Sequence, residues 1–172
     1  MARNVEIKAK IDSVDAMLPL AAKLADAGPR EIPQDDTFFA CPHGRLKLRA
    51  FPDGTGELIF YQRPDSQGPK TSEYTISPTH SPETLRQALT AAYGQVGRVR
   101  KKRTLFLIGR TRLHLDQVEG LGDFLELEVV LDPTESAAAG EATAHALLAQ
   151  LGISQEQLVA KAYVDLLQAV GR

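Results

Sequence analysis

The stretch of sequence that decides the fold is Phe124-Leu-Glu-Leu-Glu-Val-Val-Leu131, in which charged and apolar residues alternate. Neighbouring side chains of a β-strand point to opposite faces of the sheet. Glu126 and Glu128 therefore share one face, and the apolar residues at 125, 127 and 129 share the other. This alternation predicts a strand with one ionic face and one apolar face.

The same alternation recurs through most of the chain and predicts about eight strands in all. We expect them at residues 4–11, 37–41, 45–49, 57–63, 70–76, 96–108, 110–116 and 124–131. Start and stop signals predict four helices, at residues 13–27, 82–94, 135–151 and 154–170. The last of these opens at Ser154, which has capping-box spacing to Gln157.

The ionic strand faces are sorted by the sign of their charges. Arg45, Lys47 and Arg49 make one face basic, whereas Glu126 and Glu128 make another acidic. Eight strands can close into a barrel wide enough for side chains or one small ligand. If the ionic faces point inward, the helices must cover the apolar outer faces. The pattern predicts an α+β fold, an eight-stranded closed antiparallel β-barrel covered by helices, with residues 1–172 as a single domain. The alternative is a half-exposed sheet without a tunnel.

A tunnel of this kind would collect many charged side chains. The basic candidates are Lys8, Lys10, Arg45, Lys47, Arg49, Arg63, Lys70, Lys101, Arg103, Arg110 and Arg112. The acidic candidates are Glu6, Asp116, Glu126 and Glu128, with Glu73 as a further member. A bound polyanion would offset the repulsion among the cations, because arginine forks fit phosphate oxygens. Carboxylates suit Mg²⁺ or Mn²⁺, which share substrate phosphates. Both sets in one cavity predict a metal–polyphosphate substrate.

Composition narrows the class of protein further. The net charge of −2 argues against a nucleic-acid binder. Cys41 is the only cysteine, so no internal disulfide can form, which suits a reducing compartment. The first residues are charged where a signal peptide would be apolar, and no apolar run approaches the roughly 20 residues of a membrane span. We therefore expect a soluble, cytoplasmic protein that binds neither nucleic acid nor membrane.

Other catalytic chemistries have little support in the sequence. The four histidines are scattered without zinc-ligand spacing. His114 lies on an ionic strand face, where it is either a phosphate contact or a surface residue. No Gly-x-x-x-x-Gly-Lys loop is present, and Ser72 has no evident base partner for a nucleophilic mechanism.

Seven short stretches, taken in order, resemble the CYTH superfamily, also called triphosphate tunnel metalloenzymes. They are Asn4-Val-Glu-Ile-Lys8, Asp36-Thr-Phe-Phe39, Leu46-Lys-Leu-Arg49, Lys101-Lys-Arg103, Arg112-Leu-His-Leu-Asp116, Leu121-Gly-Asp-Phe-Leu-Glu-Leu-Glu128 and Tyr163-Val-Asp-Leu-Leu167. The chain looks most like the branch that includes class IV adenylate cyclases. The resemblance implies a closed eight-stranded tunnel that binds a substrate triphosphate along its length.

The resemblance also implies roles for individual residues. The implied phosphate contacts are Lys8, Lys47, Arg49, Arg63, Lys101, Arg103 and Arg112. The implied metal ligands are Glu6, Asp116, Glu126 and Glu128, with Mg²⁺ or Mn²⁺ as the cofactor. Tyr163 falls on the family's C-terminal tyrosine, near one tunnel mouth. The chain departs from the family's N-terminal Glu-x-Glu-x-Lys signature, because Asn4 replaces the first glutamate. This replacement puts the strength of metal binding, or the number of metals bound, in doubt.

Three functions follow as hypotheses. The first is a cyclase that converts ATP to cyclic AMP and pyrophosphate. The second is a triphosphatase that hydrolyses tripolyphosphate or thiamine triphosphate, with Lys8 or Lys10 as the catalytic group that assists water. The third is a non-catalytic module that senses polyphosphate or a nucleotide, which Asn4 favours. Family members are often dimers, so a homodimer is compatible with the resemblance, although no exposed apolar stripe demands one.

Overall fold

The computed structural model of the chain describes residues 2–171. The strands are β1 (Ala2–Lys10), β2 (Ala27–Phe39), β3 (Arg45–Ala50), β4 (Gly56–Gln62), β5 (Lys70–Thr79), β6 (Gln95–Ile108), β7 (Thr111–Val118), β8 (Gly122–Val130) and β9 (Leu158–Val159). The helices are α1 (Val14–Leu24), α2 (Pro82–Tyr93), α3 (Ala137–Gln150), a 3₁₀ turn at Gln155–Gln157, and α4 (Tyr163–Val170). Within residues 2–171, every helix is too short or too polar to cross a membrane.

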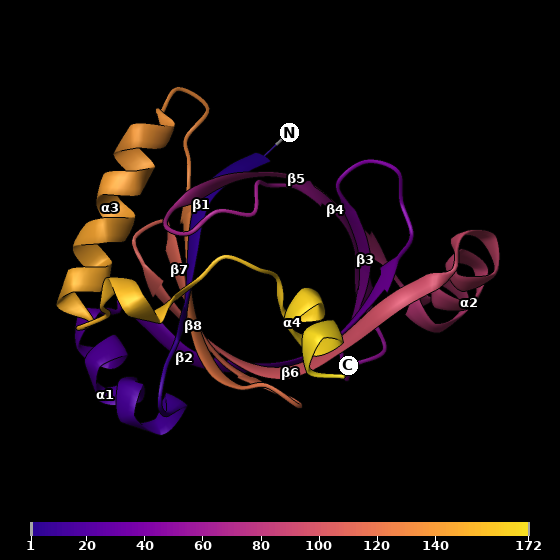
Figure 1. Cartoon of the computed structure of the whole chain (residues 1–172), viewed down its shortest axis with the longest axis horizontal. Helices are drawn as coiled ribbons and strands as arrows, with labels where there is room; N and C mark the ends of the chain where they lie inside the picture. Colours follow the sequence, from indigo (N-terminus) through magenta and orange to yellow (C-terminus); the bar gives the residue numbers. More distant parts are fainter. Residues whose placement is uncertain (1, 172) are drawn as a thin grey trace.

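Eight antiparallel strands close into a ring, which confirms the predicted fold. They are hydrogen-bonded in the order β5-β4-β3-β2-β6-β7-β8-β1, and β1 pairs in turn with β5. The ring is visible in Figure 1, which looks into it. The short strand β9 pairs with β1 beyond the end of the β1–β5 ladder, opposite Lys8 and Ala9.

The two ends of the ring differ. At one end lie the hairpins that join β3 to β4 and β6 to β7, because antiparallel neighbours place these strand ends together. The last residues of β5 pair with the first residues of β4, so they lie at the same end. We call this the open end. The opposite end holds the last residues of β1, β2 and β7 and the first residues of β6 and β8, and it is the end that α4 covers.

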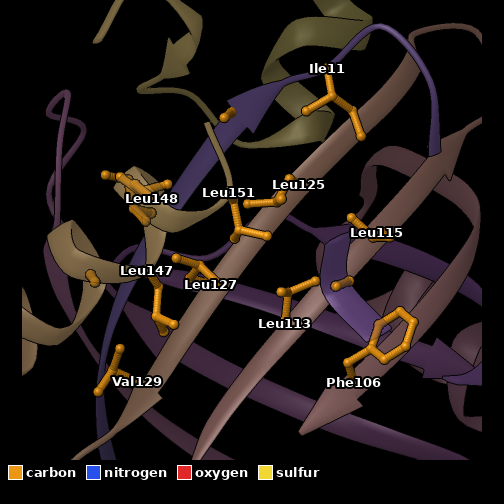
Figure 2. Close-up of a cluster of buried hydrophobic side chains, with 14 of the residues drawn as sticks. Ile11, Phe106, Leu113, Leu115, Leu125, Leu127, Val129, Leu147, Leu148 and Leu151 are labelled. Carbon is orange, nitrogen blue, oxygen red and sulfur yellow. The ribbon is translucent and has the colours of Figure 1, made fainter. Parts of the chain in front are cut away.

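The outer core lies between the ring and two helices. Alternate apolar residues of β1, β7 and β8 point outward against α1 and α3. Figure 2 shows Leu113, Leu125 and Leu127 of the ring packed beside Leu147 and Leu151 at the α3 end. Helix α2 lies on the other flank, against β2 and β3 (Figure 1). This packing stabilises the ring from outside and leaves the ionic strand faces for the interior.

A second, smaller core closes one end of the ring. Tyr163 and Val164 of α4 pack with apolar side chains on the inner faces of β2, β4, β6, β7 and β8, among them Phe38 and Phe124. Val164 comes so close to Gly97 of β6 that a Cβ atom there would lie 2.4 Å from Val164 Cγ2. The interior is therefore a cup that α4 closes at its base.

Three sequence predictions about element boundaries were wrong. The predicted helix at 154–170 is helical as α4 only from Tyr163, because the capping box at Ser154 opens a single 3₁₀ turn. The backbone then continues as β9, with Leu158 buried in the outer core. The strand predicted at 37–41 begins instead at Ala27, and α1 ends at Leu24 rather than 27. Pairing with β6 along most of its length makes this proline-containing segment a strand.

Candidate active site

The inside of the cup is a cavity of about 680 Å³ lined by side chains from all eight ring strands. Its lining follows the period of two, as on β1, where Asn4, Glu6 and Lys8 face inward and the residues between them belong to the outer core. Most of the eight strands turn an ionic face inward, whereas β5 contributes Ser72, Tyr74 and Ile76.

The structure brings together seven of the eleven basic candidates. The candidates that line the cavity are Lys8, Lys47, Arg49, Arg63, Lys101, Arg103 and Arg112, and Arg30, which was not a candidate, lines it as well. The other four lie elsewhere. Lys10 and Lys70 donate to backbone carbonyls, Arg45 pairs with Asp165 of α4, and Arg110 pairs with Glu135 on the surface. Lys10 therefore does not line the cavity, and it is not placed to assist a water molecule there.

One side of the cavity is organised around Asp36, a buried carboxylate that the sequence analysis did not single out. Arg49 binds both of its oxygens, at 2.8 and 2.9 Å. Lys101 and Lys47 approach the same carboxylate, at 3.0 and 3.6 Å. Burial by itself would raise the pKa of Asp36, but these three cations hold it well below its usual range. Burial and the neighbouring Arg49 lower the pKa of Lys47 to about 7.

Asp116 holds Arg103 in place rather than joining the other carboxylates. Arg103 donates to both oxygens of Asp116 at 2.8 Å, and the Tyr163 hydroxyl donates to Oδ2 at 2.7 Å. Asp116 is fully buried and does not line the cavity. Burial would raise the pKa of Asp116, but the guanidinium of Arg103 lowers it, so the carboxylate stays ionised.

The acidic side of the cavity gathers Glu6, Glu126 and Glu128 around His114. His114 Nδ1 lies 3.3 Å from Oε1 of both Glu126 and Glu128. Only 4% of His114 is exposed, so it is not a surface residue. Burial, and then Glu126 and Glu128, raise the pKa of Glu6 to about 7. Burial opposes ionisation of Glu126, yet its hydrogen bond with His114 and the charge of Arg103 hold its pKa well below the usual range. Glu73 of the acidic set is exposed and does not line the cavity.

The donor set on this side fits a divalent metal. Ligand atoms of His114, Glu126 and Glu128 all lie within 4.8 Å of one another. Asn4 donates from Nδ2 to Glu128 Oε2 at 3.3 Å, which leaves its Oδ1 buried without a hydrogen-bond partner. An orphaned buried carbonyl oxygen is costly unless a ligand satisfies it. Oxygen donors with one imidazole suit Mn²⁺ and also accommodate Mg²⁺.

Sequence reasoning missed several residues of the site because their strands were drawn too short. Asp36 and Gln34 line the cavity from the part of β2 that was not predicted as a strand. Asp36 was noted only within the stretch Asp36-Thr-Phe-Phe39. An alternation of Gln34, Asp36 and Phe38 was the available signal, and Pro33 obscured it.

Comparison with known proteins identifies the class. The CYTH domain family model matches residues 2–163, so the chain belongs to the CYTH family. It is 25% identical over 168 residues to adenylate cyclase CyaB of Aeromonas hydrophila, covering 93% of this chain and 86% of that protein.

Solved structures share the fold at lower sequence identity. The PH1012 protein of Pyrococcus horikoshii matches with a TM-score of 0.84 at 21% identity, over 95% of this chain and 98% of its own. HpAC1 of Hippeastrum, for which a dominant triphosphatase activity is described, matches with a TM-score of 0.68 at 16% identity, over 96% of this chain and 95% of its own. The chain is thus a CYTH family member that is similar in sequence to an adenylate cyclase and shares its fold with these two solved structures.

Proposed function

We propose that this protein is an adenylate cyclase of the class IV type, which converts ATP to cyclic AMP and pyrophosphate with Mg²⁺ or Mn²⁺. The observation that carries the proposal is the convergence of seven cations and a cluster of three carboxylates and one histidine in a single closed-based cavity. The similarity to CyaB supports ATP as the substrate.

The residues of the cavity divide the work by charge. Arg49, Lys101 and Arg103 would bind the phosphate chain and stabilise the negative charge that develops on departing pyrophosphate. Asp36 and Asp116 hold these cations in position through the ion pairs described above. The two aspartates would neutralise only part of the positive charge of the cations. The remaining net positive charge is available to bind a polyanion.

The acidic cluster would hold the metal. Glu126, Glu128 and His114 would supply its ligands, with the orphaned Asn4 Oδ1 and Glu6 within the same part of the cavity. A divalent ion bound here supplies charge neutralisation at the phosphoryl group under attack by the ribose 3′-hydroxyl. Arg63, which lies 3.3 Å from Glu6, keeps that side chain oriented.

Product analysis tests the proposal directly. Purified protein is incubated with ATP and Mg²⁺ or Mn²⁺, and the nucleotides and phosphates are separated. We expect cyclic AMP and pyrophosphate in equal amounts, and their loss in Glu126→Ala. Orthophosphate as the main product, without cyclic AMP, would overturn the cyclase assignment.

A triphosphatase is the second candidate, and Lys8 is the observation that favours it. Burial lowers the pKa of Lys8 to about 8, so a fraction of its amine is neutral at neutral pH and can accept a proton from water. Its ammonium group lies 4.0 Å from the Tyr163 ring centroid at the base of the cup. HpAC1 shows that a triphosphatase can have this fold.

Orthophosphate release, and its dependence on Lys8, tests the triphosphatase candidate. A triphosphatase should release orthophosphate from tripolyphosphate or thiamine triphosphate, and Lys8→Met should abolish this release while leaving tripolyphosphate bound. Wild-type protein that releases no orthophosphate from either compound excludes the second candidate. A non-catalytic module would bind tripolyphosphate without a metal and leave it intact.

A further inference from the structure

Four apolar side chains line the open end of the cavity on the side from β5 to β6, and we call them the mouth ring. They are Ile32, Phe51, Ile76 and Leu105, all of which line the cavity. Phe51 follows the last residue of β3, and Ile76 and Leu105 lie close to the ends of β5 and β6. Ile32 pairs with Arg103 on the neighbouring strand, two residues from Leu105. The ring is thus contributed by four different segments at one end of the barrel.

The mouth ring belongs to neither core of the molecule. Within residues 2–171, its four members are absent both from the outer core under α1 and α3 and from the inner core around α4. Ile76 is 45% exposed, and the other three are partly exposed. Apolar side chains that pack into no core yet face into a polar cavity provide an apolar surface for a ligand.

Gln34 lies just inside the mouth ring, two residues further along β2 than Ile32 and two before Asp36. It is 7% exposed, and its Oε1 is buried without a hydrogen-bond partner. Ionised phosphate oxygens only accept hydrogen bonds, so a phosphate chain cannot satisfy this carbonyl oxygen. A ligand group that satisfies Gln34 Oε1 must therefore carry a donor.

From the mouth inward, the wall changes in a fixed order. Along the face of β2 that carries Asp36, the cavity-lining residues from the rim inward are Arg30, Ile32, Gln34 and Asp36. Inside the charged rim, an apolar level is therefore followed by an amide and then by the carboxylate that gathers three cations. A linear ligand that matches this order has an apolar head with a donor group and a polyanionic tail. Inorganic tripolyphosphate has the tail alone and would leave the mouth ring in water.

We propose that the mouth ring and Gln34 form a nucleobase subsite that selects adenine. This inference rests on the proposed function, because the triphosphate must enter tail first for the base to reach the ring. The base lies against Phe51 and Ile32, and its exocyclic amine donates to Gln34 Oε1. A glutamine amide can pair with both the amine and the adjacent ring nitrogen of adenine, whereas guanine presents an oxygen in place of that amine.

The chain offers a direct optical test of base stacking. It contains no tryptophan, so Phe51→Trp introduces a single reporter at the mouth. The variant is titrated with ATP and with tripolyphosphate in EDTA, where metal-dependent turnover cannot occur. We expect saturable quenching of the tryptophan by ATP and no quenching by tripolyphosphate at concentrations that saturate the cavity. ATP that binds without quenching would place the base elsewhere and overturn the proposal.

Calorimetric titration of variants measures the contribution of each residue. Phe51→Ala should weaken ATP binding roughly 10-fold, as for loss of one aromatic stacking partner. Gln34→Leu should weaken ATP binding and reduce the preference for ATP over GTP. Both variants should bind tripolyphosphate within about twofold of wild type. Tyr93→Ala, which removes an exposed aromatic of α2 remote from the cavity lining, is the matched control and should change neither affinity.

The outcomes separate this inference from the proposed function. Wild-type protein that binds neither ligand would remove the proposed function and the subsite together. If the protein bound ATP and tripolyphosphate with equal affinity, and Phe51→Ala and Gln34→Leu left ATP affinity unchanged, the subsite would be excluded. The triphosphate site would still be supported. Tighter binding of thiamine triphosphate than of ATP would overturn the assignment to adenine.

Discussion

Arg103 of β6 and Asp116 of β7 form a two-point ion pair across paired strands, with both nitrogen–oxygen distances at 2.8 Å. Arg103 is 6% exposed and Asp116 is fully buried. The Tyr163 hydroxyl of α4 donates to the same carboxylate. A single aspartate therefore aims a cation at the cavity and also ties the helix at the base of the cup to the barrel wall.

Removal of the Asp116 charge should destabilise the protein strongly. Asp116→Asn removes the two-point partner of the buried Arg103 guanidinium, which keeps only a longer contact of 3.4 Å with Glu126, and should cost about 3–5 kcal/mol of unfolding free energy. Urea unfolding measures this loss. The matched control is Glu31→Gln, which breaks an exposed pair with Lys102, with side chains 65% and 50% exposed, and should cost less than about 1 kcal/mol. Equal losses in the two variants would contradict the role of Asp116.

Tripolyphosphate affinity should fall as the pH rises above 7. The folded-state pKa of Lys47 is about 7, against an ordinary value of 10.5, so Lys47 carries its charge below pH 7 and loses it above. Because the bound anion favours the charged amine, Lys47 must take up a proton on binding when the pH is above its pKa. The affinity therefore falls by up to roughly tenfold per pH unit above the pKa. Calorimetry in EDTA from pH 6 to 9 measures this dependence.

Lys47→Arg provides the comparison for this pH dependence. Arginine keeps its charge over the whole range, and the titration of the ligand itself is common to both proteins. The ratio of the wild-type to the variant dissociation constant should therefore rise above pH 7. A ratio that stays constant from pH 6 to 9 would show that Lys47 remains protonated in the free protein. Lys8, with a pKa of about 8, contributes equally to both proteins.

The sequence predicted the ring but not its closure at the base. Alternation identified seven ring strands and only the last residues of β2, because ionic and apolar faces leave a period of two wherever a strand separates a polar interior from an outer core. The helix at 154–170 was overextended because Leu158 and Val159 also fit a helical pattern. Only the β1 edge left free by β5 makes them a strand. Such a pairing is a property of the closed ring and has no local signal.

The candidate site was predictable to the extent that charge sorting revealed it. The seven cations implied by the family resemblance all line the cavity. Six lie on inward faces of predicted strands, and Arg63 directly follows β4, which ends at Gln62. The positions of Asp116 and His114 were not predictable in the same way. Whether a carboxylate faces a metal or a guanidinium depends on cross-strand register, here Asp116 opposite Arg103, which one sequence does not determine.

Restoring a carboxylate at position 4 should strengthen metal binding. Asn4→Glu adds a negative charge beside Glu128, where the amide now donates a hydrogen bond, and should raise Mn²⁺ affinity by roughly an order of magnitude because affinity follows the charge of the ligand set. The loss of the free Mn²⁺ signal in electron paramagnetic resonance measures binding without reference to activity. An unchanged affinity would place the metal away from position 4.

His114 should favour Mn²⁺ over Mg²⁺. An imidazole donor suits transition metals, whereas Mg²⁺ prefers oxygen ligands. His114→Gln replaces that nitrogen with an amide and should lower Mn²⁺ affinity more than Mg²⁺ affinity, as measured by competition between the two ions. A parallel loss of both affinities would mean that His114 serves only as an ion-pair partner of Glu126 and Glu128.

The seal at the base of the cup depends on the absence of a side chain at Gly97. Gly97→Ala would place a Cβ atom 2.4 Å from Val164 Cγ2, so α4 must move away from β6. Overpacking of this kind costs about 1–3 kcal/mol, and we expect faster amide hydrogen exchange at 163–170 than in wild type. Gly171→Ala is the control at the same helix, because its Cβ would meet only ordinary contacts, the nearest at 3.6 Å.

A double variant decides whether the effect at Gly97 is steric. Val164→Ala removes the methyl group that Gly97→Ala would strike, so combining the two should restore slow exchange in α4 relative to Gly97→Ala alone. Contacting residues are expected to show such non-additivity. If exchange in α4 were as slow in Gly97→Ala as in wild type, the helix would not be held by this contact. Its polar contacts would then hold it, namely the Tyr163–Asp116 hydrogen bond and the Arg45–Asp165 ion pair.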